Sequence, residues 1–133
     1  MIYAIESDLS ALEFQDVLRR STLGERRPVD DLETLEAMLR NASLTVTARD
    51  ETGKLMGVSR SVTDFVYCCY LSDLCVDAAL QRQGVGKRLI EETQAQLKPG
   101  CSLILLAAPA AKDYYPRVGF EKMDRCWWIP RKR

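Results

Sequence analysis

Two glycines at the start of an amphipathic helix form the pattern in this sequence most suggestive of chemistry. The apolar, β-rich run from Phe65 to Val76 predicts a buried strand, and a helix is predicted from Gly84 to about Lys98. Because Gly84 and Gly86 lack a Cβ atom, an anion could approach the backbone N–H groups there, at the positive end of the helix dipole. The pattern therefore predicts a phosphate or pyrophosphate site.

The spacing of these glycines excludes two other phosphate sites. The P-loop pattern G-x-x-x-x-G-K-[ST] is absent, and Leu89 stands where a dinucleotide fingerprint needs its third glycine. Two glycines also cap ordinary helices, so the rest of the chain must decide between the two interpretations.

Proton chemistry in this chain must proceed without histidine, since the sequence contains none. Asp, Glu, Tyr, Cys, Lys and water remain. Asp73 lies on the apolar strand between Leu71 and Cys75, where a carboxylate is desolvated and is a candidate general base. The alternative is that a contact with the backbone or with an arginine satisfies the Asp73 carboxylate.

The sequence contains an odd number of cysteines, and most of them lie in apolar runs. This predicts reduced, inert packing residues and no metal site. The cysteines are Cys68, Cys69, Cys75, Cys101 and Cys126.

Two motifs carry a resemblance to a known family. The strand, Gln81-x-x-Gly84-x-Gly86 and helix resemble the acetyl-CoA pyrophosphate loop of the GNAT superfamily of N-acetyltransferases, [QR]-x-x-G-x-[GA]. About thirty residues on, the run from Tyr114 to Phe120, Y-Y-P-R-V-G-F, is similar to the family's F-Y-x-x-x-G-F element. The resemblance covers nearly the whole chain. It departs at Ala108, where the family often has Asn, and at Tyr114, which replaces Phe.

The resemblance implies direct transfer of an acetyl group from acetyl-CoA to the primary amine of a small molecule, within a ternary complex. It implies that Tyr115 is the general acid, although an aromatic there could also be a packing residue. An acidic residue at the place of Asp73 serves as base or substrate anchor in part of the family. The implied cofactor-binding residues are Leu74, Cys75, Val76, Gln81, Arg82, Gln83, Gly84, Val85, Gly86 and Lys87. A protein or peptide acceptor and a non-catalytic acyl-CoA sensor remain as alternatives.

The elements that must position these residues alternate in the order β-α-α-β-β-β-α-β-α-β-β. By the resemblance, the fold class is α/β (α+β): a mixed, mostly antiparallel sheet with a central splayed parallel pair, flanked by helices. The predicted strands are Ile2–Ile5, Leu44–Arg49, Lys54–Val62, Phe65–Val76, Ser102–Ala107, Phe120–Met123 and Cys126–Ile129. The predicted helices run from a cap at Ser7 or Asp8 to about Arg20, from Asp30 to near Asn41, from Gly84 to about Lys98, and from Ala110 to Val118.

Length and charge complete the expectations. The 133 residues fit a single domain, 1–133, and 19 basic against 19 acidic residues leave no net charge. This balance predicts neither nucleic-acid nor membrane binding, and the lack of a signal peptide or a long apolar run predicts a reducing cytoplasm. The predicted C-terminal strand with Trp127 and Trp128 could pair with a second copy in a homodimer, because adjacent strand residues face opposite ways and one of the two tryptophans would be exposed.

Overall fold

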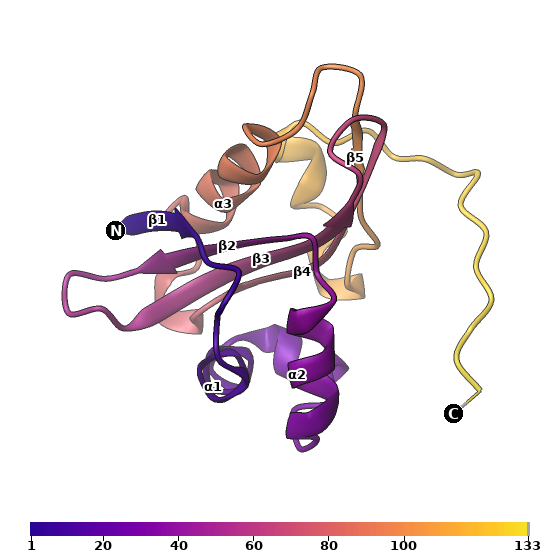
Figure 1. Ribbon diagram of the computed structural model, residues 1–133. Coiled ribbons are helices and arrows are strands. Elements are labelled where there is room, and N and C mark those ends of the chain that lie inside the picture. Colours follow the sequence, from indigo (N-terminus) through magenta and orange to yellow (C-terminus); the bar gives the residue numbers. More distant parts are fainter. Residues whose placement is uncertain (133) are drawn as a thin grey trace.

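A five-stranded sheet with helices on both faces forms the framework of the protein, which a computed structural model describes over residues 1–132. The strand order is β1-β2-β3-β4-β5, and all neighbours are antiparallel except β4 and β5. Helices α1 and α2 cover one face and α3 covers the other (Figure 1). The strands are β1 (Ile2–Ile5), β2 (Leu44–Arg49), β3 (Leu55–Thr63), β4 (Cys68–Val76) and β5 (Ser102–Ile104); the helices are α1 (Ala11–Arg20), α2 (Leu32–Arg40) and α3 (Val85–Gln94); and the 3-10 turns are η1 (Thr22–Arg26), η2 (Ala78–Leu80), η3 (Pro109–Ala111) and η4 (Tyr115–Val118). The predicted fold class is confirmed.

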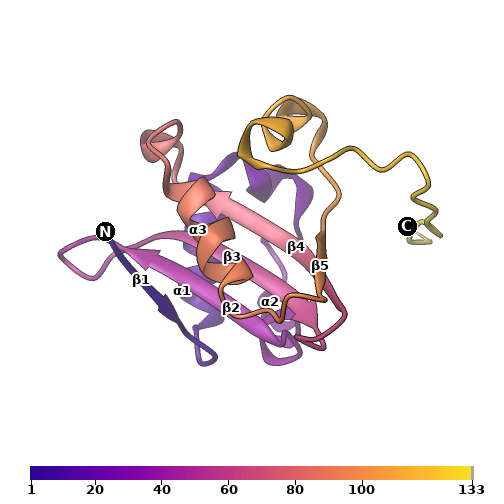
Figure 2. The ribbon, with the colours of Figure 1, turned by 90° about the horizontal axis from the view of Figure 1, so that it is seen from above.

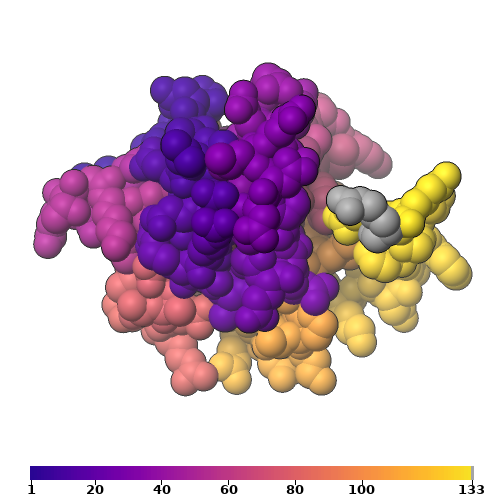
Figure 3. Space-filling model, turned by 90° about the horizontal axis from the view of Figure 1, so that it is seen from below, coloured from indigo at the N-terminus to yellow at the C-terminus, as the bar shows by residue number. Residues whose placement is uncertain are grey.

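The first face of the sheet is closed by two short amphipathic helices. Phe14, Val17 and Leu18 of α1 are fully buried, and they pack with Leu35 of α2 against the sheet. Figure 3, seen from this side, shows the two helices lying against each other across the face. The predicted cap of the first helix at Ser7 or Asp8 is wrong, because the side chain of Ser10 accepts the Glu13 N–H instead, and α2 is capped by Asp31 rather than Asp30.

The second face is closed by α3, which approaches the sheet closely at Gly57. A Cβ atom on Gly57 would lie 3.0 Å from Leu89 Cδ1 and 3.2 Å from the Cys75 carbonyl oxygen. Val85 and Leu89 pack there against β2, and Thr93 is fully buried. The predicted start of this helix is confirmed, whereas its predicted end at about Lys98 is four residues too late, because α3 ends at Gln94.

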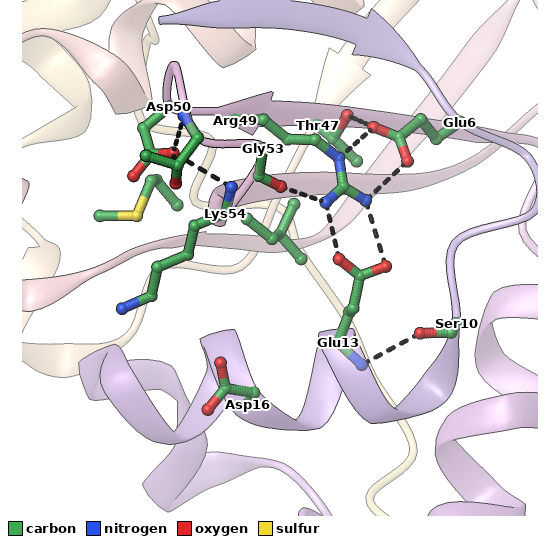
Figure 4. Close-up of polar contacts among 12 residues, drawn as sticks. Glu6, Ser10, Glu13, Asp16, Thr47, Arg49, Asp50, Gly53 and Lys54 are labelled. Carbon is green, nitrogen blue, oxygen red and sulfur yellow. Dashed lines mark hydrogen bonds and ion pairs between the residues drawn. The ribbon is translucent and has the colours of Figure 1, made fainter.

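One arginine joins four separate segments on the side of the β2–β3 hairpin. The Arg49 guanidinium contacts both oxygens of Glu6, at 2.9 Å each, and both oxygens of Glu13, at 2.6 and 3.2 Å (Figure 4). It also donates to the Gly53 carbonyl oxygen at 2.9 Å. Since Glu6 follows β1 and Glu13 belongs to α1, this network fixes the first helix relative to the sheet.

The predicted long strand from Phe65 begins later than expected. Phe65 has a φ of 70°, and the Asp64 carboxylate accepts the N–H groups of Val66, Tyr67 and Cys68 at 2.8 to 3.1 Å. These bonds close a turn, so that β4 begins only at Cys68.

The C-terminal quarter differs most from the sequence-based expectation. The predicted helix Ala110–Val118 is replaced by η3 and η4, because Pro116, in the interior of the predicted helix, has no N–H group to donate to the carbonyl oxygen four residues earlier. The predicted strands Phe120–Met123 and Cys126–Ile129 are wrong: within residues 1–132 no strand follows β5. Figures 1 and 2 show this tail standing away from the sheet, where it has no neighbouring strand to pair with. No helix among residues 1–132 is long and apolar enough to span a bilayer.

Candidate active site

The parallel pair at the centre of the site separates early. β5 pairs with β4 only at Cys68, Cys69 and Tyr70, whereas β4 continues to Val76. Beyond Tyr70, the backbone of β4 therefore has no strand neighbour on that side within the described chain. The predicted splay is observed, and its open edge runs through Leu74, Cys75 and Val76, the residues implied to contact the cofactor.

Those three residues have different surroundings. Leu74 and Val76 are half-buried beside α3, whereas the Cys75 side chain lies in the core under α1 and α2. Burial raises the pKa of the Cys75 thiol to about 12, so it stays protonated at neutral pH and is a poor nucleophile. The Cys75 thiol is therefore not the nucleophile of this site. Cys68, in contrast, is exposed, which corrects the expectation that it lies in the core.

The loop before α3 has the backbone geometry of an open anion cradle. Gly84 caps the helix at a φ of 84° without any side-chain hydrogen bond, and nothing lies within 4 Å of the position of a Cβ atom there. Arg82 also has a positive φ, 69°, which is unusual for a residue with a side chain. The first N–H groups of α3 have no partner inside the helix, so they point toward this open space.

The side chains around this loop divide between anchors and free cations. Val85 is buried and fixes the first turn, and Gln83 donates to the Ala79 carbonyl oxygen at 3.3 Å. Gln81, Arg82 and Lys87 are exposed, and within residues 1–132 no ion pair holds either cation. The nearby Arg88 is engaged elsewhere, with Glu92 and the Tyr3 ring.

Tyr114 connects the loop to the predicted general acid. A Cβ atom on Gly86 would lie only 2.9 Å from the Tyr114 hydroxyl oxygen, so this tyrosine lies against the first turn of α3. The Tyr114 ring meets the Tyr115 ring edge-to-face with centroids 5.1 Å apart, and Tyr115 meets Phe120 in the same way at 5.4 Å. The second motif is thereby packed beside the first.

Tyr115 is electrostatically suited to hold a proton. Burial is the main cause that raises the pKa of its hydroxyl, the neighbouring Tyr114 raises it further, and the Arg27 charge opposes the rise. The hydroxyl is therefore neutral throughout the physiological pH range and can act as a donor.

Asp73 has its carboxylate oxygens occupied by two arginines. It is fully buried; Arg27 Nε donates to one carboxylate oxygen and Arg60 Nε to the other. Arg27 also donates to the Ser72 carbonyl oxygen at 2.7 Å, and Arg60 donates to the Met38 carbonyl oxygen at 3.1 Å. This geometry matches the alternative interpretation of Asp73, satisfaction by arginine, while its role as a base stays a prediction.

Arg27 is the residue of this region that the sequence did not single out. It follows η1, on the connection between α1 and α2. Its side chain reaches a bulge of β4 at Ser72, the residue left over because Asp73 pairs with Arg60 and Leu71 pairs with Ser61 on β3. Its guanidinium binds Asp73, and its charge acts on Tyr115. Arg27 lies 46 positions from Asp73 in the chain, and no local pattern signals the pairing.

Comparison with known proteins places the chain in a family. Residues 21–126 match the model of the acetyltransferase (GNAT) domain. The chain belongs to the GNAT family. It is 26% identical over 109 residues to the uncharacterized N-acetyltransferase ycf52 of Pyropia yezoensis. This alignment covers 75% of this chain and 63% of that protein. The chain spans only 43% to 51% of the length of three further curated relatives.

Solved structures with the same fold extend over almost all of the chain. A GNAT family acetyltransferase from Streptococcus pneumoniae aligns with a TM-score of 0.76 and 21% identity over 98% of both chains. The GNAT family N-acetyltransferase YhbS from Escherichia coli, solved in complex with CoA, aligns with a TM-score of 0.69 and 22% identity over 90% of this chain and 68% of YhbS. At these identities the likeness describes the fold.

Proposed function

We propose that this GNAT domain transfers the acetyl group of acetyl-CoA directly to the primary amine of a small molecule. The observation that carries the proposal is the juxtaposition of the free edge of β4, the glycine-capped start of α3, and the tyrosine pair of Tyr114, which lies against that first turn, and Tyr115. Each of the three supplies one of the contacts that the reaction requires.

The residues present fit the donor. A diphosphate suits the start of α3, because Gly84 leaves room and the exposed cations Arg82 and Lys87 stand beside the helix N-terminus. The amide groups of an extended pantetheine arm suit the β4 edge, where the backbone of Leu74 and Val76 can bind it as a neighbouring strand would.

When bound, acetyl-CoA supplies an activated thioester carbonyl, whose C–S bond breaks as the amine forms the new N–C bond. The chain provides two groups for this exchange. A backbone N–H near Leu74 or Cys75 stabilises the negative charge that develops on the carbonyl oxygen, an interaction worth about 3–4 kcal/mol in other enzymes. The Tyr115 hydroxyl donates a proton to the departing sulfur, and the proton that the attacking amine loses restores the tyrosine hydroxyl through solvent.

The contacts that hold η1 and Arg27 against β4 favour a small acceptor. Arg27 binds Asp73 and the Ser72 carbonyl oxygen, so the connection between α1 and α2 is held against β4 rather than leaving a wide surface for a folded protein. The proposal also includes a homodimer and a cytoplasmic location; the free state of all five cysteines supports the latter.

The test is release of free CoA from acetyl-CoA in the presence of a panel of small amines and of lysine-containing peptides. We expect turnover with at least one small amine and a large loss in the Tyr115→Phe variant. Tyr67→Phe is the matched control, because Tyr67 is 76% exposed and loses the same hydroxyl group. Acetyl-CoA binding without turnover of any amine would favour the sensor alternative, and turnover of peptides alone would favour the protein acceptor.

A further inference from the structure

A positive charge is left in excess where the connection between α1 and α2 meets β4. Arg27 and Arg60 both bind the carboxylate of Asp73, and within residues 1–132 neither arginine pairs with another acid. The three groups together therefore carry one net positive charge. The Arg60 side chain is 8% exposed and that of Arg27 is 22% exposed. A ligand can therefore reach this charge through Arg27.

Arg27 also keeps hydrogen-bond donors for such a ligand. A guanidinium group has five N–H groups. Arg27 uses three of them, for Asp73, for the Ser72 carbonyl oxygen at 2.7 Å and for the Arg26 carbonyl oxygen at 2.8 Å. The remaining N–H groups have no acceptor in the described part of the chain. Because three contacts hold the guanidinium in place, little conformational entropy is lost when it binds an anion.

The position of Arg27 is on the acceptor side of the proposed reaction centre. Its charge acts on Tyr115, and it binds the backbone of β4 at the bulge, two residues before Leu74. The start of α3, which suits the diphosphate of the donor, belongs to the opposite face of the sheet (Figure 1). An acceptor that approaches the thioester from the face of α1 and α2 therefore meets Arg27.

The acidic residues of this region do not reverse its charge. Both carboxylate oxygens of Asp73 are occupied by the arginines, so Asp73 is not open to an ammonium group. Glu25 is exposed on η1, but the next residue is the exposed Arg26, which carries the opposite charge. The local charge thus favours an anionic group on the acceptor and disfavours a second cationic group.

We propose that the acetyl acceptor is a primary amine that also carries an acidic group, a carboxylate or a phosphate, and that Arg27 binds this group. The inference rests on the proposed function and deepens it, because it defines a second functional group of the acceptor. Paired N–H groups of a guanidinium match the oxygens of either anion. Asp73 holds Arg27 in position for this contact.

The first experiment compares acceptors that differ only in the acidic group. Phenylalanine is paired with phenethylamine, lysine with cadaverine, and glucosamine 6-phosphate with glucosamine; the last pair tests a phosphate, the others a carboxylate. The rate of CoA release gives kcat/KM, which is expressed per neutral amine so that differences in amine pKa do not enter. We expect the acidic member of at least one pair to be preferred about 10- to 100-fold, the usual value of a hydrogen bond to a charged group.

The second experiment assigns this preference to Arg27. Arg27→Gln should remove most of the preference, whereas a merely structural role would lower kcat/KM for both members of a pair equally. Arg26→Gln is the matched control, because it removes the same charge from the adjacent, exposed residue. It should retain the wild-type preference. An equal loss of preference in both variants, or none in Arg27→Gln, would overturn the role of Arg27.

A third measurement uses the wild-type chain alone, because Arg27→Gln also removes a partner of the buried Asp73. Its probes lack the amine and keep the acid: 3-phenylpropionate for a carboxylate and glucose 6-phosphate for a phosphate. In the presence of CoA, the probe that matches the preferred pair should raise Tm and inhibit competitively against the acceptor. A probe that neither raises Tm nor inhibits would contradict the anion contact.

These experiments also separate the inference from the proposed function. If no amine is acetylated, the proposed function fails and the inference fails with it. If amines are acetylated without any preference for the acidic member of a pair, the inference alone is refuted, since transfer then proceeds without the contact to Arg27.

Discussion

Asn at position 73 is the substitution that best separates a structural from a catalytic carboxylate. Asp73→Asn keeps the shape of the side chain and removes its charge. The two guanidinium groups that now share the carboxylate, those of Arg27 and Arg60, then face each other across an uncharged amide. The Arg60 side chain is 8% exposed and that of Arg27 is 22% exposed, so water can compensate for little of this loss.

The magnitude follows from the burial of the three groups. Removing one partner of a buried ion pair typically costs about 3–5 kcal/mol, because the remaining charge stays buried without compensation. For a domain of this size, such a decrease in the free energy of unfolding corresponds to a decrease in Tm of roughly 10–20 °C. It would also consume a large part of a total stability of about 5–15 kcal/mol.

The assay is urea and thermal unfolding, with kcat/KM for the acceptor amine measured across pH on the same variant. Asp30→Asn is the matched control, since Asp30 pairs with Arg19 at 2.8 Å but is 91% exposed. An exposed pair of this kind contributes about 0–1 kcal/mol. The contrast between the two Asp→Asn changes therefore measures the effect of burial.

A Tm within a few degrees of the wild type in Asp73→Asn would refute the structural account. If kcat/KM also fell and its acidic limb moved, Asp73 would be the base. A triple variant, Arg27→Met/Asp73→Leu/Arg60→Met, tests the same point independently, because replacing a whole buried ion network with apolar residues is often neutral. We expect it to recover part of the lost stability.

Four further predictions address the loop, the acid and the acid stability. Gly84→Ala should cost about 1–2 kcal/mol at a φ of 84° and weaken acetyl-CoA binding in calorimetry, although no neighbour obstructs the methyl group. Arg82→Gly should relieve a backbone at 69° and raise Tm, yet weaken acetyl-CoA binding through the lost cation. Tyr115→Phe should lower kcat about 10²- to 10⁴-fold, and the basic limb of wild-type kcat should lie above the usual tyrosine pKa because burial raises the pKa of Tyr115. Hydrogen bonds from Arg49 hold the pKa of Glu6 below its ordinary value. The Glu6–Arg49 interaction therefore contributes to the free energy of unfolding at pH values above the ordinary pKa of Glu6, and this contribution is lost as the pH falls through the lowered pKa. In an acid titration of stability, Arg49→Met should lack this loss.

The elements that could be predicted are those in which local pattern and tertiary packing agree. The hairpin of β2 and β3 and the start of α3 follow from alternation, a turn and an amphipathic stripe. The C-terminal strands could not be predicted correctly, because β-propensity reflects packing against neighbours, and the tail containing Trp127 and Trp128 has none within the described chain.

Ion pairs between residues far apart in the sequence could not be predicted either. Asp73 could be recognised as an unusual carboxylate on an apolar strand, but its partners lie 46 and 13 positions away. Many arginines in the sequence were equally plausible partners. Only the fold brings Arg27 to the bulge of β4, and with it a charge that acts on Tyr115.

The candidate site is located where regular backbone pairing stops. β4 loses its parallel neighbour after Tyr70, its pairing with β3 shifts at Ser72, and α3 begins after the Gly84 cap without a side-chain capping hydrogen bond. The Ser72 carbonyl oxygen at the bulge accepts a hydrogen bond from Arg27, whereas the open edge of β4 and the start of α3 leave polar backbone groups without a strand or helix partner, and such groups are available to bind a ligand. A sequence signals such interruptions only where they demand a special residue. This is why the glycine at the start of α3 could be recognised, whereas the splay itself was inferred only from the resemblance.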